Sequence, residues 1–143
     1  MTTDNAETLN TLTQNNKTTE QKIKEWNLDL GVIQSVPLMS YKSYINSVYH
    51  SSFIISDSGT AQEEPALFNT PVIVPRDFTE RPESIENGCS FMVDVNTINN
   101  ITWNQSVEYL RKIKEGIIKI NSEWLGDGNT SKKITSKIKE LCE

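Results

Sequence analysis

The residues of this chain best suited to bind a charged ligand lie in a polar turn, Ser56-Asp57-Ser58-Gly59. The turn follows an apolar run, Phe53-Ile54-Ile55, and precedes a segment with helical character. A glycine lets the backbone approach a ligand closely, and the free N–H groups at a helix start attract anions. The pattern therefore predicts a phosphate site at Ser58 and Gly59. The alternative is that these residues form only a turn and a helix start.

A charged loop offers a second set of ligand-binding groups. Arg76 and Arg81 stand there among Asp77, Glu80 and Glu83. A planar guanidinium can donate two parallel hydrogen bonds to a phosphate. The alternative is a solvated cluster of salt bridges, which contributes little stability.

Two strands must position these loops. The apolar runs at residues 53–55 and 72–74 are too short for helices and too continuous for half-exposed strands, which favours a parallel sheet buried on both faces. The segment between them is expected to be helical and to close at Asn69-Thr70. Within it, Thr60 and Glu63 fit a capping box, in which each side chain bonds the other's backbone N–H, and we prefer this structural role for Glu63.

Two sequence boxes carry a family resemblance. SDSGTAQEE and PVIVPRDFTERPE, at residues 56–64 and 71–83, resemble the C-terminal lobe of the non-hydrolysing UDP-N-acetylglucosamine 2-epimerases, where TDSGG-x-QEE precedes R-D-x-TERPE. The boxes are also spaced as in that family. Val36-Pro37-Leu38 with Tyr41 and Tyr44 upstream, and Trp124-x-Gly126-Asp127-Gly128 downstream, extend the resemblance over roughly the last three quarters of the chain.

The resemblance implies an α/β fold with a Rossmann-like parallel sheet and flanking helices, as part of the C-terminal lobe of a two-lobed, GT-B-like protein. It implies a reaction that releases UDP transiently and inverts carbon 2, interconverting UDP-N-acetylglucosamine and UDP-N-acetylmannosamine for cell-surface polysaccharide biosynthesis. The family draws its proton-transfer groups from the other lobe and from a histidine before the region covered here. We therefore expect this chain to hold the leaving-group clamp without the catalytic residues, and to use no cofactor or metal.

By the same resemblance, six residues form the UDP site: Ser58, Gly59, Thr60, Glu64, Arg81 and Tyr44. The Glu64 carboxylate would accept hydrogen bonds from the ribose hydroxyls, and Arg81 would meet the diphosphate. Tyr44 would support the uracil, although packing into a core suits it equally. Two departures from the family pattern put UDP affinity in doubt, because Thr60 replaces a second glycine and Met39 replaces a glutamine of some members.

The remaining elements follow from apolar periodicity. Helices are expected at residues 19–28, 40–51, 83–87 and 129–143, and further strands at residues 31–36 and 91–93. One long helix or two joined helices are expected over residues 103–123. Gly88 should end the third helix, and Gly126-Asp127-Gly128 should break the chain. Residues 1–18 are rich in Thr and Asn and are predicted to be a disordered N-terminal segment. Residues 19–143 would then form one UDP-binding domain, whose sheet has an unpaired edge because opening units of the lobe are missing.

Composition narrows the range of partners and locations. The chain has 143 residues and a net charge of −5, which suits one domain and argues against nucleic acid or an anionic membrane as a partner. No apolar run reaches the ~20 residues of a membrane span, and the N-terminus lacks a signal pattern, so we predict a cytoplasmic protein. Cys89 and Cys142 are expected to be reduced thiols. The lone histidine, His50, is expected on a helix surface.

Three functional hypotheses stay open. The first is a truncated or split epimerase that is inactive alone and completed by a separate N-terminal-lobe chain or by a homo-oligomer. The second is a non-catalytic UDP-sugar-binding or interaction module. The third, the nucleotide lobe of a UDP-sugar glycosyltransferase, is disfavoured by the TERPE box. In the first hypothesis the final helix docks the partner through Ile134, Ile138 and Leu141, whereas alternatively this stripe folds onto the chain's own sheet.

Overall fold

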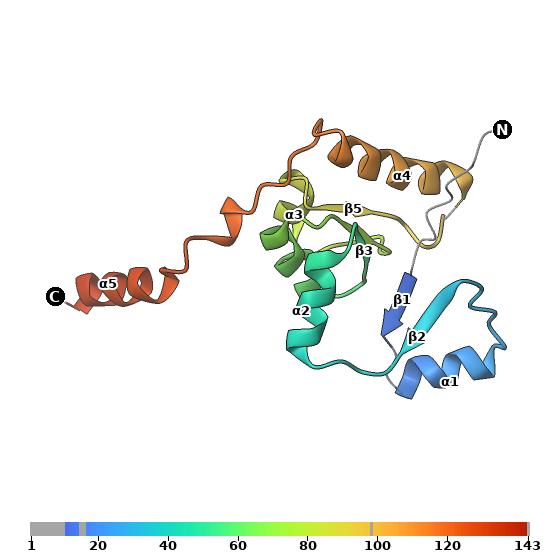
Figure 1. Ribbon diagram of the computed structural model, residues 1–143. Helices are drawn as coiled ribbons and strands as arrows, with labels where there is room; N and C mark the ends of the chain where they lie inside the picture. Colours follow the sequence, from blue (N-terminus) through green and yellow to red (C-terminus); the bar gives the residue numbers. More distant parts are fainter. Residues whose placement is uncertain (1–10, 15–16, 98, 143) are drawn as a thin grey trace. The chain divides into compact units, whose positions relative to one another are not determined.

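The computed structural model describes residues 11–14, 17–97 and 99–142 of the chain (Figure 1). The chain divides into two compact units, Met1–Asn46 and Ser47–Glu143. Each unit contains a parallel sheet, of two strands in the first and three in the second. The predicted α/β class with parallel strands is therefore confirmed.

The first unit pairs two short strands around one helix. Thr11 lies opposite Ile33 and Gln14 opposite Val36 in a parallel register. The helix between the strands ends at Glu25, and Asn27, two residues later, is left-handed (φ 46°), a conformation that asparagine tolerates well. The elements of this unit are β1 (Thr11–Gln14), α1 (Lys17–Glu25), β2 (Ile33–Val36) and the beginning of α2 (Tyr41–His50), which runs on into the second unit.

The start of the chain differs in part from the sequence prediction. Strand β1 and the beginning of α1 at Lys17 lie inside the segment 1–18 for which we predicted disorder. Composition reports how much apolar surface a segment can bury, but it does not report backbone pairing with a distant strand such as β2. The prediction for residues 1–10 falls outside the described residues, so the boundary at residue 18 stays a prediction.

The second unit is built on a three-stranded sheet in the order β3-β4-β5. Ile54 pairs with Val72, and Val72 with Ser90. The central strand is no more than 3% exposed along its length, which confirms that it is buried on both faces. The same prediction is wrong for β3, because Ile55 is 51% exposed and this strand lies at the edge of the sheet. The elements are β3 (Ile54–Ile55), η1 (Thr60–Gln62), η2 (Glu64–Phe68), β4 (Val72–Val74), α3 (Pro82–Glu86), β5 (Ser90–Met92), α4 (Asn100–Lys114), η3 (Glu123–Leu125) and α5 (Thr130–Cys142).

The core lies between the sheet and α4, which runs alongside β5 in Figure 1. Ile73, Val93 and Tyr109 form its buried centre. The Tyr109 ring stacks on Phe91 with centroids 5.4 Å apart, and its hydroxyl donates to the Gly88 carbonyl at 3.1 Å. Helix α4 is thus fixed to the sheet by both apolar and polar contacts.

Helix α4 ends earlier than the periodicity predicts. Gly116 adopts φ 72°, its N–H bonds the Ile113 carbonyl at 2.9 Å, and the N–H of Ile117 bonds the Lys112 carbonyl at 2.9 Å. This pair of bonds is a Schellman motif, which terminates a helix. The predicted helix at residues 103–123 is therefore wrong beyond Lys114, because the period of the apolar residues continues past a glycine that stops the helix.

The chain after α4 returns to the turn between α3 and β5. Asn121 N–H donates to the Asn87 carbonyl at 3.0 Å, and the thiol of the fully buried Cys89 donates to the Asn121 carbonyl at 3.3 Å. Burial raises the pKa of the Cys89 thiol. Gly88 has φ 70° and ends α3, as predicted.

The last helix, α5, has no buried residue. Its apolar stripe is open, since Ile134, Ile138 and Leu141 are 54%, 56% and 76% exposed. In this structure the stripe does not fold onto the chain's own sheet.

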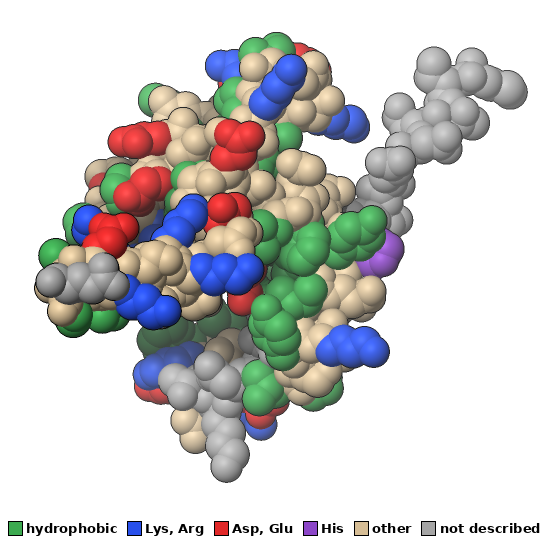
Figure 2. Space-filling model, turned by 90° about the vertical axis from the view of Figure 1, so that its left-hand side faces the viewer, with side chains coloured by type: hydrophobic (Ala, Val, Ile, Leu, Met, Phe, Trp, Pro, Cys, Tyr) green, Lys and Arg blue, Asp and Glu red, His purple; other side chains and the backbone are tan. Residues whose placement is uncertain are grey.

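On the face shown in Figure 2, side chains of both charges are interspersed. No helix in the described part of the chain has the length and apolar character needed to cross a membrane.

Candidate functional site

The two predicted ligand-binding loops leave the sheet at the same edge. Strands β3 and β4 run parallel with Ile55 opposite Ile73, so the segments that follow them begin side by side. The first contains Ser58 and Gly59, and the second contains Arg81. In open parallel sheets, ligands bind outside the carboxyl ends of the strands. The fold therefore supports the prediction that these two boxes belong to one site.

The first loop gathers hydrogen-bond donors at its tip. The hydroxyls of Ser58 and Thr60 lie 3.1 Å apart, and the Ser58 N–H donates to the Ser56 hydroxyl at 3.2 Å. Among the residues that the structure describes, we find no acceptor for the N–H groups of Gly59 and Thr60. Two uncommitted N–H groups beside two hydroxyls form a small surface able to bind an anion.

Gly59 is not required by the chain's own geometry. Its backbone is right-handed helical, with φ −60° and ψ −44°, which any residue can adopt. A Cβ atom built on it would meet nothing within 4 Å. Space in front of Gly59 is therefore open, as close approach of a ligand to the backbone would need.

The helix expected after Gly59 is two short 3₁₀ turns, η1 and η2. Pro65 has no N–H to donate to the Ala61 carbonyl, which prevents one continuous α-helix. The predicted capping box is also wrong, because neither Thr60 nor Glu63 makes a side-chain cap bond. A dipole from so short a segment is small, so an anion here would depend on individual donors.

Glu63 binds the arginine of the second loop instead. Its carboxylate accepts from Arg81 Nε at 2.5 Å, with both side chains about one-third exposed. Arg81 Nη1 donates to the Glu80 carbonyl at 3.1 Å. We find no acceptor for Nη2 within the described residues, so part of the guanidinium remains available to an anion.

A partly buried polar network, which was not predicted from the sequence, joins the two loops. The Thr79 hydroxyl donates to Gln62 Oε1 at 2.7 Å and accepts from the Arg81 N–H at 3.0 Å. Gln62 is fully buried, and its carbonyl accepts from the Ser84 hydroxyl at 2.9 Å. Gln62 Nε2 has no partner among the described residues. The available signal was the presence of Gln62 and Thr79 within the two boxes that carry the resemblance.

The other two predicted residues lie elsewhere in the fold. Glu64 begins η2, directly after Glu63, and is half-buried. Tyr44 is half-buried in α2 and belongs to the first unit. Their contacts with ribose and uracil stay predictions. His50, at the end of α2, is exposed.

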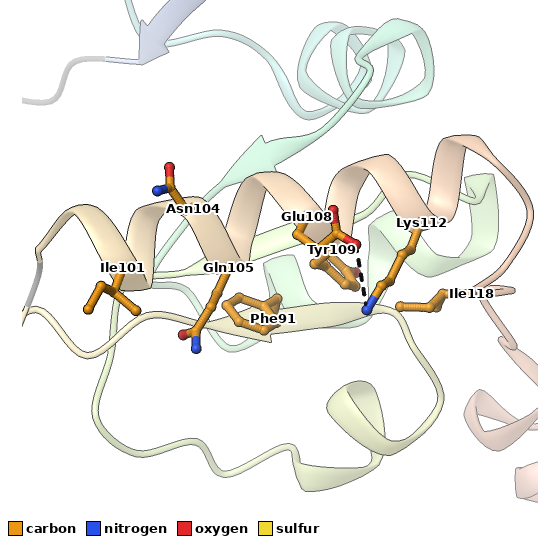
Figure 3. A pocket seen from close by; sticks show the side chains of 8 residues that line it. All are labelled: Phe91, Ile101, Asn104, Gln105, Glu108, Tyr109, Lys112 and Ile118. Atoms are coloured by element: carbon orange, nitrogen blue, oxygen red, sulfur yellow. Dashed lines mark ion pairs between the residues drawn. The ribbon is translucent and has the colours of Figure 1, made fainter.

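A hollow of the same unit lies along another element. A groove of about 600 Å³ lies along α4, and Figure 3 shows Phe91 and Tyr109 among the side chains that line it. Its two charged residues, Glu108 and Lys112, pair at 3.7 Å. A hydrogen bond from Arg111 lowers the pKa of Glu108. None of the predicted site residues lines this groove, whose remaining residues are Ile101, Asn104, Gln105 and Ile118.

Metal binding is not supported by any grouping in the described part of the chain, where no three His, Cys, Asp or Glu residues could hold an ion together. The donors at the β3–β4 edge are N–H, hydroxyl and guanidinium groups. Such groups suit an anionic ligand.

Comparison with known proteins identifies relatives. A family model described as UDP-N-acetylglucosamine 2-epimerase matches residues 3–139. A curated protein of that name from Salmonella borreze is 39% identical over 104 residues, which are 71% of this chain and 27% of the relative. The match to epimerases also gives no support to the glycosyltransferase alternative.

Solved structures give the same result. The UDP-GlcNAc 2-epimerase of Methanocaldococcus jannaschii superposes with a TM-score of 0.71 at 25% identity, covering 90% of this chain and 35% of that one. The Neisseria meningitidis enzyme, bound to UDP-GlcNAc, superposes with a TM-score of 0.60 at 28% identity, covering 87% and 34%. The chain thus spans about a third of the length of these structures.

Proposed function

Because the chain belongs to the UDP-N-acetylglucosamine 2-epimerase family, we propose that the β3–β4 edge binds the UDP part of a UDP-sugar. The observation that supports this most is the uncommitted donors on both loops at one edge, namely the N–H groups of Gly59 and Thr60 and Nη2 of Arg81. A diphosphate carries the concentrated negative charge that such donors stabilise. The Neisseria relative bound to UDP-GlcNAc supports the choice of ligand.

In this proposal each residue contacts a different part of the ligand. Ser58 and the backbone N–H groups of Gly59 and Thr60 contact phosphate oxygens, and Arg81 neutralises the diphosphate. Glu64 accepts hydrogen bonds from the ribose hydroxyls, because a carboxylate offers only acceptors to a vicinal diol. The uracil rests on the ring of Tyr44. No cofactor takes part in this binding.

Calorimetric titration with UDP tests the binding site. Arg81→Met should lose ~1.5 to 3 kcal/mol of binding free energy, the contribution of a hydrogen bond between charged groups. Lys112→Met removes the same charge from the α4 groove and serves as the matched control, with UDP affinity unchanged. Equal affinities of Arg81→Met and the parent chain would show that Arg81 does not contact the diphosphate.

We further propose that the isolated chain does not epimerise UDP-N-acetylglucosamine. Proton removal and return at carbon 2 need positioned acids and bases. The resemblance assigns those groups to segments that have no counterpart in this chain, and His50 is exposed at a helix end. The chain would therefore supply the leaving-group clamp to an active site completed by an N-terminal-lobe chain or a homo-oligomer. The open stripe of α5, Ile134, Ile138 and Leu141, would dock that partner.

The test is to incubate UDP-N-acetylglucosamine with the chain alone and with a separately expressed N-terminal lobe of a relative, following the sugar protons by NMR. Turnover is expected only in the mixture. Ile138→Asp should abolish it by placing a charge in the docking stripe, whereas Lys139→Asp, beside the stripe, should have less effect. Turnover by the chain alone would contradict this proposal. UDP binding without turnover in the mixture would instead favour a non-catalytic UDP-sugar-binding module.

A further inference from the structure

Building on the proposed UDP site, we propose that Glu63 is a positioning residue that holds Arg81 ready for the diphosphate. The Glu63 carboxylate accepts from Arg81 Nε at 2.5 Å and so restrains the plane of the guanidinium. Nε cannot then turn toward the ligand. The terminal nitrogens are the part that remains, and Nη2 has no acceptor in the described residues.

The backbone of Arg81 is held from the same short stretch. Its N–H donates to the Thr79 hydroxyl at 3.0 Å, and that hydroxyl donates to Gln62 Oε1 at 2.7 Å. Gln62 is fully buried and precedes Glu63 in the chain. Two consecutive residues therefore restrain Arg81, one at the main chain and one at the side chain. Restraining a long side chain before binding lowers the entropy that the ligand must otherwise remove.

Two effects of Glu63 on an anionic ligand oppose each other. Its negative charge repels a diphosphate, so its removal should tighten binding if charge alone matters. Its hydrogen bond orients Arg81, so its removal should weaken binding if orientation matters more. Stability offers no explanation for the pair, because both side chains are about one-third exposed and such ion pairs contribute little to folding. The sign of the change in affinity therefore distinguishes the two effects.

Three variants separate orientation from charge. Glu63→Ala should weaken UDP binding about threefold to tenfold, the equivalent of leaving one long side chain to be ordered by the ligand. Glu63→Gln keeps an oxygen that accepts from Nε and should bind UDP as the parent does, or more tightly. Glu80→Ala is the matched control: it removes the same charge next to Arg81 but keeps the backbone carbonyl that accepts from Nη1. Its UDP affinity should not fall.

Two further measurements exclude a merely structural effect. In the Arg81→Met background, Glu63→Ala should cause no additional loss of UDP affinity, because the residue acts only through Arg81. Binding of uridine, which lacks phosphate, should be the same in the parent chain and in Glu63→Ala, as followed by NMR titration. A fall in uridine affinity, or equal losses in Glu63→Ala and Glu63→Gln, would overturn the positioning role.

The remaining outcomes separate this inference from the proposed function. If the parent binds UDP and Arg81→Met loses affinity while Glu63→Ala binds as tightly as the parent or tighter, the UDP site stands and the positioning role is wrong. If the parent does not bind UDP, the proposed function fails, and the inference fails with it. Thermal unfolding of each variant verifies that it is folded, and Glu63→Met, which keeps the side-chain length but removes the acceptor for Nε, should weaken UDP binding in place of Glu63→Ala should that variant not fold.

Discussion

The α4 groove and the β3–β4 edge are two candidate ligand regions on one unit, and they differ in how their polar groups are used. The groove is a hollow of about 600 Å³ and is lined by apolar rings such as Phe91 and Tyr109. Its charges, Glu108 and Lys112, satisfy each other. The edge instead holds donors without acceptors in the described residues, including the N–H of Gly59 and Nη2 of Arg81.

The comparison shows that the hollow along α4 and the donors available to an anion lie in different regions of the molecule. Tyr109 and Phe91 stack on each other and anchor α4, so the walls of the groove are also the core of the unit. Donors left without acceptors cost free energy unless water or a ligand satisfies them. A site retained for an anion should therefore show unused donors, as the edge does. We expect substitutions in the groove to change stability and substitutions at the edge to change UDP affinity.

The largest expected effect is on stability, at the groove. Tyr109→Ala should lower the free energy of unfolding by about 3 kcal/mol or more, because it removes a ring that is 6% exposed and its bond to Gly88. Chemical denaturation measures the loss. UDP affinity, measured where the variant remains folded, should be that of the parent. A weaker UDP affinity in the folded variant would connect the groove to ligand binding and break the comparison.

A smaller loss of stability is expected at the turn beneath the groove. Gly88→Ala should cost about 1 to 2 kcal/mol for a side chain at φ 70°, with a further penalty because the new Cβ would lie 2.9 Å from Ile118 Cγ2 and 3.1 Å from the Lys119 carbonyl oxygen. Gly116→Ala is the matched control, with φ 72° and nothing within 4 Å of the Cβ. Thermal unfolding should therefore rank Gly88→Ala as the less stable. Equal stabilities would show that Ile118 and Lys119 move away from the new Cβ without cost.

The smallest expected effect is on affinity, at the edge. Thr60→Gly restores the glycine of the family pattern and should tighten UDP binding by no more than about 1 kcal/mol, since it frees the backbone but removes a hydroxyl that lies 3.1 Å from Ser58 Oγ. Titration calorimetry measures the difference, with Thr79→Ser, which keeps its hydroxyl, as the control of unchanged affinity. Weaker binding would identify the Thr60 hydroxyl as a ligand contact and not an obstacle.

Much of the sheet could be predicted from sequence because its signals are local. The continuous apolar runs gave β3 and β4 and their parallel pairing, and Gly88 gave the end of α3. The same local signals misled where a second residue intervened. Pro65 divides the helix predicted after Gly59, and Gly116 ends α4 although the apolar period continues. A single proline or glycine can end a helix even where the apolar periodicity of the surrounding residues continues.

For the candidate site, the sequence indicated which two boxes take part but not the contacts between their side chains. The Ser58-Gly59 turn and the Arg81 loop follow two paired strands, whereas their union in one UDP site was implied by the family resemblance and stays a prediction. The bond between Glu63 and Arg81 could not be predicted, because a capping box suits the same glutamate and the two residues are far apart in sequence. The burial of Gln62 was missed for a related reason: polar residues are mostly exposed, and only the fold shows that Thr79 and Ser84 provide partners.

The register of the three-stranded sheet bears on how the second unit folds. Ile54 pairs with Val72 and Val72 with Ser90, so each pairing joins residues 18 positions apart. Closing loops this short carries a modest entropic cost. During synthesis, β3 can pair with β4 as soon as β4 has left the ribosome, and β5 can join before α4 is complete. The residues of the edge that carries Ser58 and Arg81 are therefore synthesised before those of the helical layer.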